Sequence, residues 1–342
     1  MQTPYLPTLE DVAREAKVST ATVSRCLNMP GKVTEKTQKR VLAAVKLLGY
    51  SPNFGARALA AKRTNTIGAV VPTLENAIFA RGLQAFQEEI NRNGATLLVA
   101  SSGYQQKLEE EQIRNLVARG ADALLLIGND RSEEIYTFLR KRGIPWVIAW
   151  NYQDVPNHCF VGFNNQSAAK EITGKAIKLG HTRIAMIAGI TRGNDRARDR
   201  LLGVKDAIIE NGIPIESFDV IEAPYSFVDG GDAIETLLKN NPRPTVVICG
   251  NDILAVGAIK RLKSLGLMVP EDISITGFDD IEVASVIEPE LTTVHVPHRA
   301  MGTKAAKSLL KMIEQDDPCE SQQLDTFIAV RHSLSKPPEG MS

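Results

Sequence analysis

The chain has 342 residues, and its 40 Lys and Arg balance 40 Asp and Glu, so the formal net charge is zero. That balance hides an asymmetry, because residues 1–63 carry eleven basic and four acidic side chains, whereas the remaining residues carry 29 and 36. A basic segment joined to a slightly acidic body indicates that one end of the chain contacts a polyanion. No secretory leader and no run of 18 apolar residues occurs, which predicts a cytoplasmic protein that does not enter a membrane.

Three short helices are predicted within the basic segment. Thr8 precedes an apolar stripe of helical period and is followed three residues later by Asp11, the pattern of a capping box. Ser19 and Thr34 are the expected caps of the second and third helices. Two helices joined by a tight turn and backed by a third make a helix-turn-helix, whose second helix fits the DNA major groove. On architecture alone, the alternative is a three-helix bundle with a solvated polar face.

The residues themselves narrow this choice. Four segments, 8–13, 18–25, 27–28 and 49–53, resemble the N-terminal signature of the LacI/GalR family of bacterial transcriptional regulators, and the similarity continues to about residue 333. The resemblance implies a DNA-binding regulator, most often a repressor and not an enzyme, that acts as a homodimer on a near-palindromic operator in the bacterial nucleoid. It also implies control by a small-molecule effector, a sugar or sugar acid, with no cofactor.

The second helix supplies the expected DNA contacts. By resemblance, Thr20, Ala21 and Arg25 point into the major groove, where Arg can fork onto guanine and Thr or Ala can meet a thymine methyl group. Short hydrogen-bonding side chains and Tyr50 suit phosphate oxygens, which fix register without reading sequence. The expected phosphate contacts are Thr8, Ser19, Thr22, Ser24, Asn28 and Tyr50.

A second DNA-binding element is expected at residues 51–63. Pro52 imposes an extended entry, and the residues after it resemble the family's hinge helix, which orders on operator DNA and lies in the minor groove. The alternative is a linker whose Leu59 packs on the body. The residues expected in the minor groove are Asn53, Ala56, Arg57, Leu59 and Ala60.

Beyond residue 64, short apolar runs alternate with amphipathic helices, as in a parallel α/β sheet. The expected strands are 67–71, 95–99, 123–127 and 146–149 in one unit, and 183–188, 246–249, 273–276 and 292–294 in a second. The predicted fold is therefore an all-α helix-turn-helix with a hinge helix, followed by a two-lobed, doubly wound α/β core that resembles periplasmic binding proteins. Two such lobes imply a ligand cleft near the carboxyl ends of the strands.

The expected domains follow from three chain crossings between the lobes, near 163–165, 294–297 and 319–324. They are 1–50 for the helix-turn-helix, 51–63 for the hinge, 64–163 plus 297–320 for the first lobe, and 164–296 plus 321–342 for the second.

Candidate effector residues lie at strand ends or match the family's pocket. They are Phe79, Trp150, Arg198, Arg200, Asn251, Asp279 and His298. Each has an alternative: Asn251 can cap a helix, Asp279 can belong to a turn, and Arg200 can form a surface salt bridge. Trp150 either stacks on a sugar ring or fills the core, and a lone His such as His298 is more often structural.

The segment around Arg200 is unusually cationic. Arg192, Arg196, Arg198 and Arg200 fall within nine residues, tempered by Asp195 and Asp199. Two of the four guanidinium groups facing one cleft would favour an anionic effector such as a sugar acid over a neutral sugar.

Two other function classes receive less support. The chain lacks phosphate-binding glycine motifs, a nucleophile elbow and a zinc-protease motif, so no catalytic role is predicted. A solute-binding or sensor protein without DNA function is the alternative, because the body alone would look like one. The cysteines lack CxxC spacing and are expected to be reduced thiols that hold no metal. They are Cys26, Cys159, Cys249 and Cys319.

Overall fold

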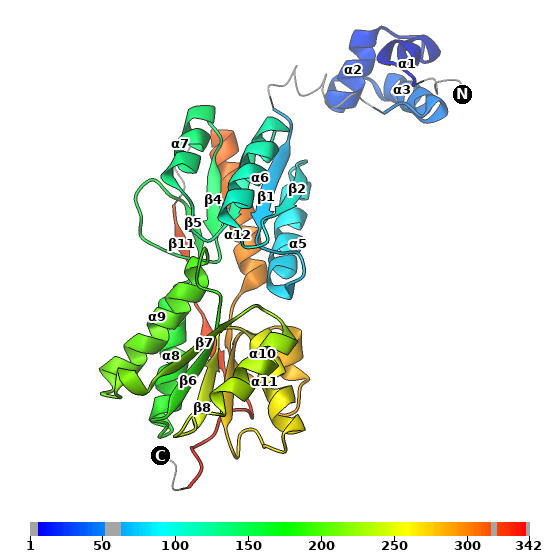
Figure 1. The fold of residues 1–342 in the computed structure, drawn as a ribbon. Coiled ribbons are helices and arrows are strands. Elements are labelled where there is room, and N and C mark those ends of the chain that lie inside the picture. The colour runs from blue at the N-terminus through cyan, green and yellow to red at the C-terminus, as the bar shows by residue number, and fades with distance from the viewer. Residues whose placement is uncertain (1–5, 52–62, 316–319, 340–342) are drawn as a thin grey trace, which may run out of the picture. The chain divides into compact units, whose positions relative to one another are not determined.

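The computed structural model describes residues 6–51, 63–315 and 320–339, and the chain divides into two compact units between Thr64 and Asn65 (Figure 1). The expected hinge residues, namely Asn53, Ala56, Arg57, Leu59 and Ala60, lie outside the described part of the chain.

The smaller unit has the three helices that the sequence predicts. They are α1 Leu9–Glu15, α2 Thr20–Asn28 and α3 Glu35–Leu48, with a single 3-10 turn, η1 Pro30–Lys32, before α3. The capping box at Thr8 and Asp11 is confirmed, because the Thr8 hydroxyl accepts from the Asp11 amide and the Asp11 carboxylate accepts from the Thr8 amide. Ser19 caps α2 through the Thr22 amide. Gly49, with φ of 64°, ends α3 in the left-handed conformation.

The apolar faces of these helices meet in one small core. Val12, Val23 and Val41, one from each helix, are fully buried. Helices this short are marginal in isolation, so this shared core keeps α2 helical and holds its outer face in place.

The larger unit contains two six-stranded sheets with the same winding order. In the first lobe the order is β11-β5-β4-β3-β1-β2, and in the second it is β12-β10-β9-β8-β6-β7. The first-lobe strands are β1 Thr66–Val71, β2 Thr96–Ser101, β3 Ala123–Ile127, β4 Trp146–Ala149, β5 Phe160–Gly162 and β11 Gln322–Gln323. The second-lobe strands are β6 Ile184–Gly189, β7 Asp219–Ala223, β8 Val246–Cys249, β9 Ser274–Asp279, β10 Thr292–His295 and β12 Phe327–Ala329.

All eight predicted strands are confirmed to within a few residues, and the described part of the chain contains four further strands. Three of these four lie near or at sheet edges and are short, and β7 is largely half-exposed, so its sequence mixes polar and apolar residues. Burial on both faces produces the continuous apolar runs of inner strands such as β1, β3 and β6, whereas the edge strand β2 is only partly buried and is recognised by its own apolar run, residues 97–99. Among the described strands, only β12 is antiparallel to its neighbour, β10.

Helices cover both faces of each sheet. The first lobe has α5 Ala77–Arg92, α6 Gln106–Ala118, α7 Glu133–Arg142 and α12 His298–Gln315. The second lobe has α8 Asn165–Lys178, α9 Asp195–Glu210, α10 Phe227–Leu237 and α11 Asp252–Ser264, with 3-10 turns η2 Ile215–Ser217 and η3 Glu282–Ser285. One apolar core runs continuously under α5 and α12 in the first lobe and α8 and α9 in the second. The outer faces have separate cores, under α6 and α7 and under α10 and α11.

The chain crosses between lobes after β5, after β10 and after β11. The first crossing lies between Gly162 and Asn165, and the second lies between His295 and His298. The third lies later than expected, between β11 and β12, because Gln322 and Gln323 pair with Val161 and Gly162 in the first-lobe sheet. Residues 321–323 therefore extend the first lobe beyond the expected boundary at residue 320.

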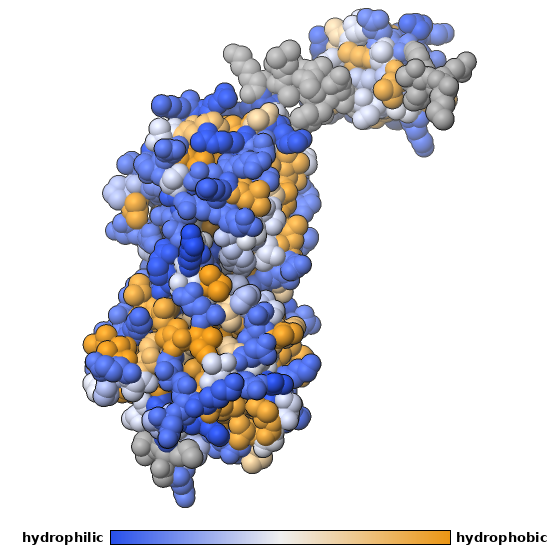
Figure 2. Space-filling model, viewed as in Figure 1, coloured by the Kyte–Doolittle hydropathy of each residue, from blue (hydrophilic) through white to orange (hydrophobic). Residues whose placement is uncertain are grey.

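The surface of the larger unit narrows where the lobes meet, and most of the visible face is polar, with apolar side chains in separate patches (Figure 2). Among the described residues, no helix is long and apolar enough to cross a membrane.

Close packing of α5 against α12 yields the first prediction. A Cβ at Gly302 would lie 2.0 Å from the carbonyl oxygen of Gly82, so one helix would have to move. We expect Gly302→Ala to lower the free energy of unfolding by about 1–3 kcal/mol. Gly174→Ala is the matched control, because its Cβ meets nothing within 4 Å on helix α8. It should raise stability by about 0.5–1 kcal/mol. Urea unfolding midpoints measure both, and equal changes would refute the packing argument.

Candidate functional site

Helix α2 presents one outward polar face on the smaller unit. Thr20, Ala21 and Arg25 are all exposed, whereas Val23 and Cys26 on the opposite side are buried. At about 100° per residue, the three exposed positions share one side of the helix. The structure thus brings the three predicted base-reading residues together on a surface that is free to enter a groove.

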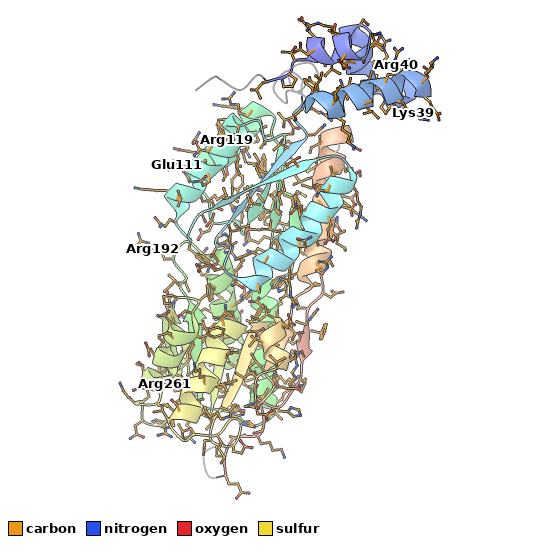
Figure 3. The ribbon with its side chains drawn as sticks, turned by 90° about the vertical axis from the view of Figure 1, so that its right-hand side faces the viewer. Lys39, Arg40, Glu111, Arg119, Arg192 and Arg261 are labelled. Carbon is orange, nitrogen blue, oxygen red and sulfur yellow. The ribbon has the colours of Figure 1, made fainter. Side chains whose placement is uncertain are left out.

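The predicted phosphate contacts surround this face but have local bonds of their own. The hydroxyls of Ser19 and Thr22 lie 2.9 Å apart, and the Asn28 amide donates to Ser24 at 3.3 Å. Thr8 donates to Asp11 at 2.7 Å, which commits its hydroxyl to the cap of α1. Tyr50 is half-buried against the helix core. These bonds orient the hydroxyls, and the exposed atoms that remain suit phosphate oxygens. Figure 3 shows that Lys39 and Arg40 project from α3 of the same unit.

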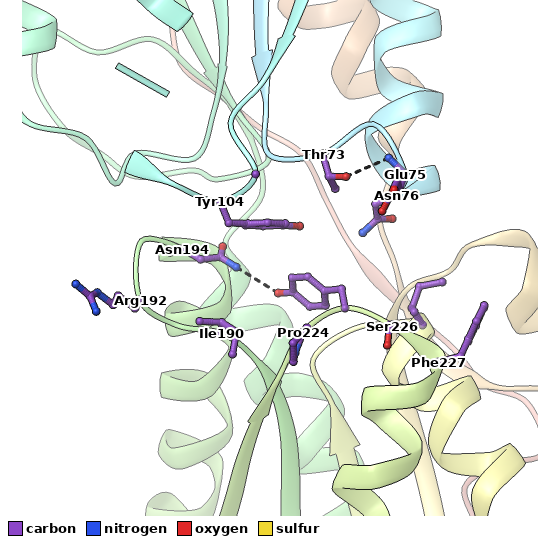
Figure 4. A pocket seen from close by; sticks show the side chains of 13 residues that line it. Thr73, Glu75, Asn76, Tyr104, Ile190, Arg192, Asn194, Pro224, Ser226 and Phe227 are labelled. Atoms are coloured by element: carbon purple, nitrogen blue, oxygen red, sulfur yellow. Dashed lines mark hydrogen bonds between the residues drawn. The ribbon is translucent and has the colours of Figure 1, made fainter. Parts of the chain in front are cut away.

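The two lobes of the larger unit enclose a cavity of about 570 Å³ at the carboxyl ends of their strands (Figure 4). This volume is typical of small-molecule sites. The cavity is lined by Thr73, Glu75, Asn76, Gly103, Tyr104, Ile190, Arg192, Asn194, Pro224, Tyr225, Ser226, Phe227 and Ile253.

A much smaller inner pocket, of about 20 Å³, continues behind this cavity. It shares Asn76, Tyr104, Asn194 and Tyr225 with the outer one, and its remaining lining residues are Ile78, Phe79, Trp150, Arg196, Arg200, Asn251 and Asp279. The rings of Tyr104 and Tyr225, one from each lobe, are 5.8 Å apart at their centroids. Five predicted effector residues, Phe79, Trp150, Arg200, Asn251 and Asp279, therefore meet in one place.

Arg200 is buried in this inner pocket and is fully engaged. Its Nε donates to Asn165 Oδ1 at 2.9 Å, Nη1 to the Gly250 carbonyl at 2.6 Å, and Nη2 to Asp279 Oδ1 at 3.3 Å. The guanidinium also lies 3.7 Å over the ring of Phe278. Only 6% of the side chain is exposed, so the surface salt-bridge alternative does not hold. Burial raises the pKa of Asp279 to about 6, although Arg200 beside it favours the charged form.

Asn251 and Asp252 have separate tasks. Asn251 caps α11 by accepting from the Leu254 amide at 2.9 Å, and its buried side chain also lines the inner pocket. Asp252 instead accepts from the Thr293 hydroxyl and from the Ile281 amide, which ties two strand ends together. The Asn251 side chain thus caps α11 and lines the pocket at the same time.

Trp150 and His298 link the two lobes behind the pocket. The Trp150 indole donates to His298 Nδ1 at 3.2 Å, and His298 Nε2 lies 3.2 Å from the Asp279 carbonyl. A neutral imidazole protonated at Nε2 satisfies both bonds. Trp150 also packs against Phe79, with ring centroids 5.6 Å apart, and is fully buried. His298 is absent from the pocket lining, which agrees with its structural alternative.

The four clustered arginines take different directions. Arg196 lines the inner pocket and pairs with Asp195 at 2.8 Å, whereas Arg198 pairs with Asp130 at 3.0 Å and lines neither pocket. The predicted contact of Arg198 with the effector has no support in this geometry. Arg192 is exposed at the rim of the outer cavity and points away from it in Figure 4.

Several lining residues were not among those predicted from the sequence. Asn76, Tyr104, Asn194, Arg196 and Tyr225 line the inner pocket together with the predicted residues. Tyr104 and Tyr225 follow the ends of β2 and β7 by a few residues, and that position was the available signal. Because β7 was not recognised as a strand, its strand-end aromatic residue was missed.

The prediction of four reduced cysteines is wrong at Cys159, which is disulfide-bonded. Cys26 and Cys249 are free and buried, as expected, and Cys319 lies outside the described residues. Short-spacing motifs detect only cysteines that are close in sequence, so they give no information about a bond between distant positions.

The buried imidazole yields a prediction about pH. Burial lowers the pKa of His298 to about 3, whereas the unfolded value is near 6.5, so only the unfolded chain gains a proton as pH falls through 6.5. Acidification therefore removes stability from the wild type relative to His298→Gln. From pH 7.5 to pH 5 the difference in unfolding free energy between the two proteins should shift by roughly 2 kcal/mol in favour of the variant. Asp279, whose raised pKa acts in the opposite direction, is present in both proteins. A difference independent of pH would show that His298 titrates normally.

Comparison with known proteins agrees with both units. Residues 64–331 match the model of periplasmic binding proteins and the sugar-binding domain of the LacI family, and residues 8–53 match that of bacterial regulatory proteins of the lacI family. Catabolite control protein A of Priestia megaterium is 31% identical over 309 residues, covering 90% of this chain and 93% of the relative. The HTH-type transcriptional repressor PurR of Aliivibrio fischeri (strain ATCC 700601 / ES114) is 34% identical, covering 91% and 93%.

Known structures give the same result. A LacI family regulator from Silicibacter pomeroyi has a TM-score of 0.87 at 28% identity, with 96% of this chain and 99% of that chain covered. The Lac repressor dimer bound to operator and the anti-inducer ONPF has a TM-score of 0.84 at 27% identity, with 97% and 100% covered. The chain therefore belongs to the LacI family of DNA-binding transcriptional regulators, which join a helix-turn-helix unit to an effector-binding core and are not enzymes.

Proposed function

We propose that this chain acts as a cytoplasmic, nucleoid-associated homodimer that binds a near-palindromic operator as a repressor and is controlled by a sugar or sugar acid in the cleft between its lobes. The observation that carries the proposal is the presence, in one chain, of an exposed recognition face on α2 and a buried polar pocket at Arg200, Asn251 and Asp279. A solute-binding protein without DNA function has no use for the first of these.

At the DNA, Thr20, Ala21 and Arg25 are proposed to read base edges, while the hydroxyls of Ser19, Thr22 and Ser24 hold phosphates. The hinge residues around Leu59 are proposed to enter the minor groove between the two half-sites. The Lac repressor structure, described as a dimer bound to operator, supports the dimer and the target.

In the cleft, the chemistry suits a polyhydroxylated ligand. Arg196 and Asn251 offer donors and Asp279 offers an acceptor, while the aromatic ring of Tyr225 can cover an apolar sugar face. A regulator CelR in complex with cellobiose, with a TM-score of 0.70 and 28% identity, supports a sugar. The arginine cluster is also compatible with a sugar acid as the effector. Asp195, Asp130 and Asp279 pair with three of the four arginines, however, so the positive charge available to an anionic ligand is small.

Effector and operator are proposed to shift the same equilibrium, the one between two arrangements of the lobes in the dimer. If closing the lobes on a ligand changes how the first lobes of a dimer meet, operator affinity changes with it. Thermodynamic linkage then requires the operator to change effector affinity by the same factor.

DNA reading is tested with Arg25→Ala in the full chain. Duplexes selected by the wild type from a random library serve as operator, and gel shifts compare them with random duplexes. We expect a loss of about 1–3 kcal/mol on the selected duplex and a smaller loss on random DNA, because a bidentate guanine contact is specific. Arg14→Ala, an exposed arginine on α1, is the control and should weaken both duplexes alike. Equal loss from Arg25→Ala would make Arg25 a phosphate contact, and no shift by the wild type at low salt would refute DNA binding.

The effector site is tested by a thermal-shift screen of neutral sugars and sugar acids, followed by calorimetry on the ligands that bind. Arg196→Met should weaken binding about tenfold or more, because a charged hydrogen-bond donor is lost from the pocket. Arg198→Met is the matched control from the same helix, and it should change affinity by less than about twofold because its pair with Asp130 is exposed. If both variants changed ligand affinity by a similar factor, the ligand would have to bind outside the inner pocket.

A further inference from the structure

The acidic and basic side chains at the start of helix α9 lie on two different faces of the helix. Asp195 and Asp199, four residues apart, both contact Asn151 of the first lobe. Arg196 and Arg200, also four residues apart, line the inner pocket. Because residues at i and i+4 share one helix face, the first two turns carry one acidic face toward the other lobe and one basic face toward the ligand site.

Asp195 makes two short, buried hydrogen bonds across the lobes. One carboxylate oxygen, Oδ2, accepts from the Asn129 amide at 2.6 Å and from Asn151 Nδ2 at 2.7 Å, and Oδ1 pairs with Arg196. Asp195 is 3% exposed, and its pKa is lowered despite burial because Arg196 and these donors favour the charged form. Its donors come from the first lobe, whereas Asp195 opens a second-lobe helix.

The first-lobe side of this contact is held in place. Gly128, with φ of 69°, lets the backbone approach so closely that a Cβ there would lie 1.8 Å from Arg196 Nη1. Arg131 fixes the same loop by donating to the carbonyls of Ile127 and Gly128, and its side chain is buried and paired with Glu109. Asn129 Oδ1 accepts from the Tyr136 hydroxyl at 2.6 Å. The loop that presents the Asn129 amide is thus pre-shaped for Asp195.

The neighbouring contacts between the lobes are weaker. Asp199 accepts from Asn151 at 3.2 Å and is half-buried, and burial together with the nearby Asp195 raises its pKa. The pairs Arg198–Asp130 and Arg81–Glu282 are exposed, and exposed pairs contribute little. Among the contacts that these α9 residues make with the first lobe, those of Asp195 are therefore the shortest and most buried.

We propose that Asp195 is a positioning residue that clamps the first turn of α9 to the first lobe. In the clamped conformation the cleft is closed and Arg196 and Arg200 are held in the inner pocket, so these features are gained or lost together. The ligand's part in this account rests on the proposed function, but the clamp itself does not. Breaking the clamp should let the lobes separate without any ligand and should disturb both arginines together.

Trp150 provides a local readout of cleft opening. It is 1% exposed, lines the inner pocket, and is one of only two tryptophans in the sequence. In a Trp146→Phe background, acrylamide quenching therefore reports the access of solvent to the inner pocket. We expect Asp195→Asn to raise the quenching constant on the order of threefold, because an open state becomes populated. Asn151→Leu, which removes the partner from the opposite lobe, should do the same, and the double variant should exceed neither.

Two variants separate clamping from general destabilisation. Ile259→Val shortens a buried side chain in the core beneath α10 and α11, and it should leave quenching unchanged while lowering the urea midpoint. Asp199→Asn removes a carboxylate one turn further along α9 and should have a smaller effect than Asp195→Asn. Unchanged quenching in folded Asp195→Asn, or equal quenching in Ile259→Val, would overturn the proposal.

The clamp and the proposed function can fail separately. Quenching needs neither DNA nor effector, so an open cleft in Asp195→Asn supports the clamp even if no duplex is ever selected. Conversely, the wild type could bind operator and respond to a sugar while Asp195→Asn showed normal quenching. That result would support the proposed function and refute the clamp.

Discussion

A buried guanidinium has to be paired, and that requirement organises the core of this regulator. Removing a charge from water costs several kcal/mol unless hydrogen bonds and an opposite charge replace the lost solvent. Arg200 meets the requirement with groups from three elements: Asn165 at the start of α8, the Gly250 carbonyl after β8, and Asp279 at the end of β9. The strand ends of the second lobe are thereby held in one arrangement around a single side chain, and the pocket is the space that this arrangement leaves.

The same requirement links the pocket to the other lobe. Asn165, which accepts from Arg200, donates to the carbonyl of Trp150 at 3.0 Å, and Trp150 donates to His298. Asp195, which bonds to the first lobe, lies at the start of the helix that carries Arg200, about one turn before it. A ligand that displaced the guanidinium would therefore move bonded groups in both lobes. Coupling between ligand binding and lobe position needs such a continuous network of contacts.

Much of this could be predicted from the sequence, for reasons that are physical. Strands buried on both faces produce unbroken apolar runs, so the inner strands and the strand-end residues Asn251 and Asp279 could be located, and Thr8 with Asp11 marked the start of α1. The edge strand β7 mixes polar and apolar residues and has no such run, so it was not predicted, and the strand-end Tyr225 was missed with it. Arg198 was predicted as a pocket residue and Arg196 was not, although Arg196 lines the inner pocket and Arg198 lines neither pocket. A run of alternating arginines does not show which helix face is inward until the packing of α9 against α8 and the first lobe fixes its rotation. Asp195 gave no sign of its role, because its partners, Asn129 and Asn151, lie more than forty residues away.

The sizes of the two cavities bear on how a ligand can act. A volume of about 20 Å³ holds little more than one water molecule, so a sugar that enters the inner pocket has to widen it. The outer cavity of about 570 Å³ is large enough, and Tyr104 and Tyr225, whose ring centroids lie 5.8 Å apart, line both it and the inner pocket. These two rings belong to opposite lobes, so a ligand that passes from the outer cavity into the inner pocket moves the lobes or the rings apart. A ligand that binds there consequently has different affinities for the two arrangements of the lobes, and such a difference is the only means by which a ligand can shift a conformational equilibrium.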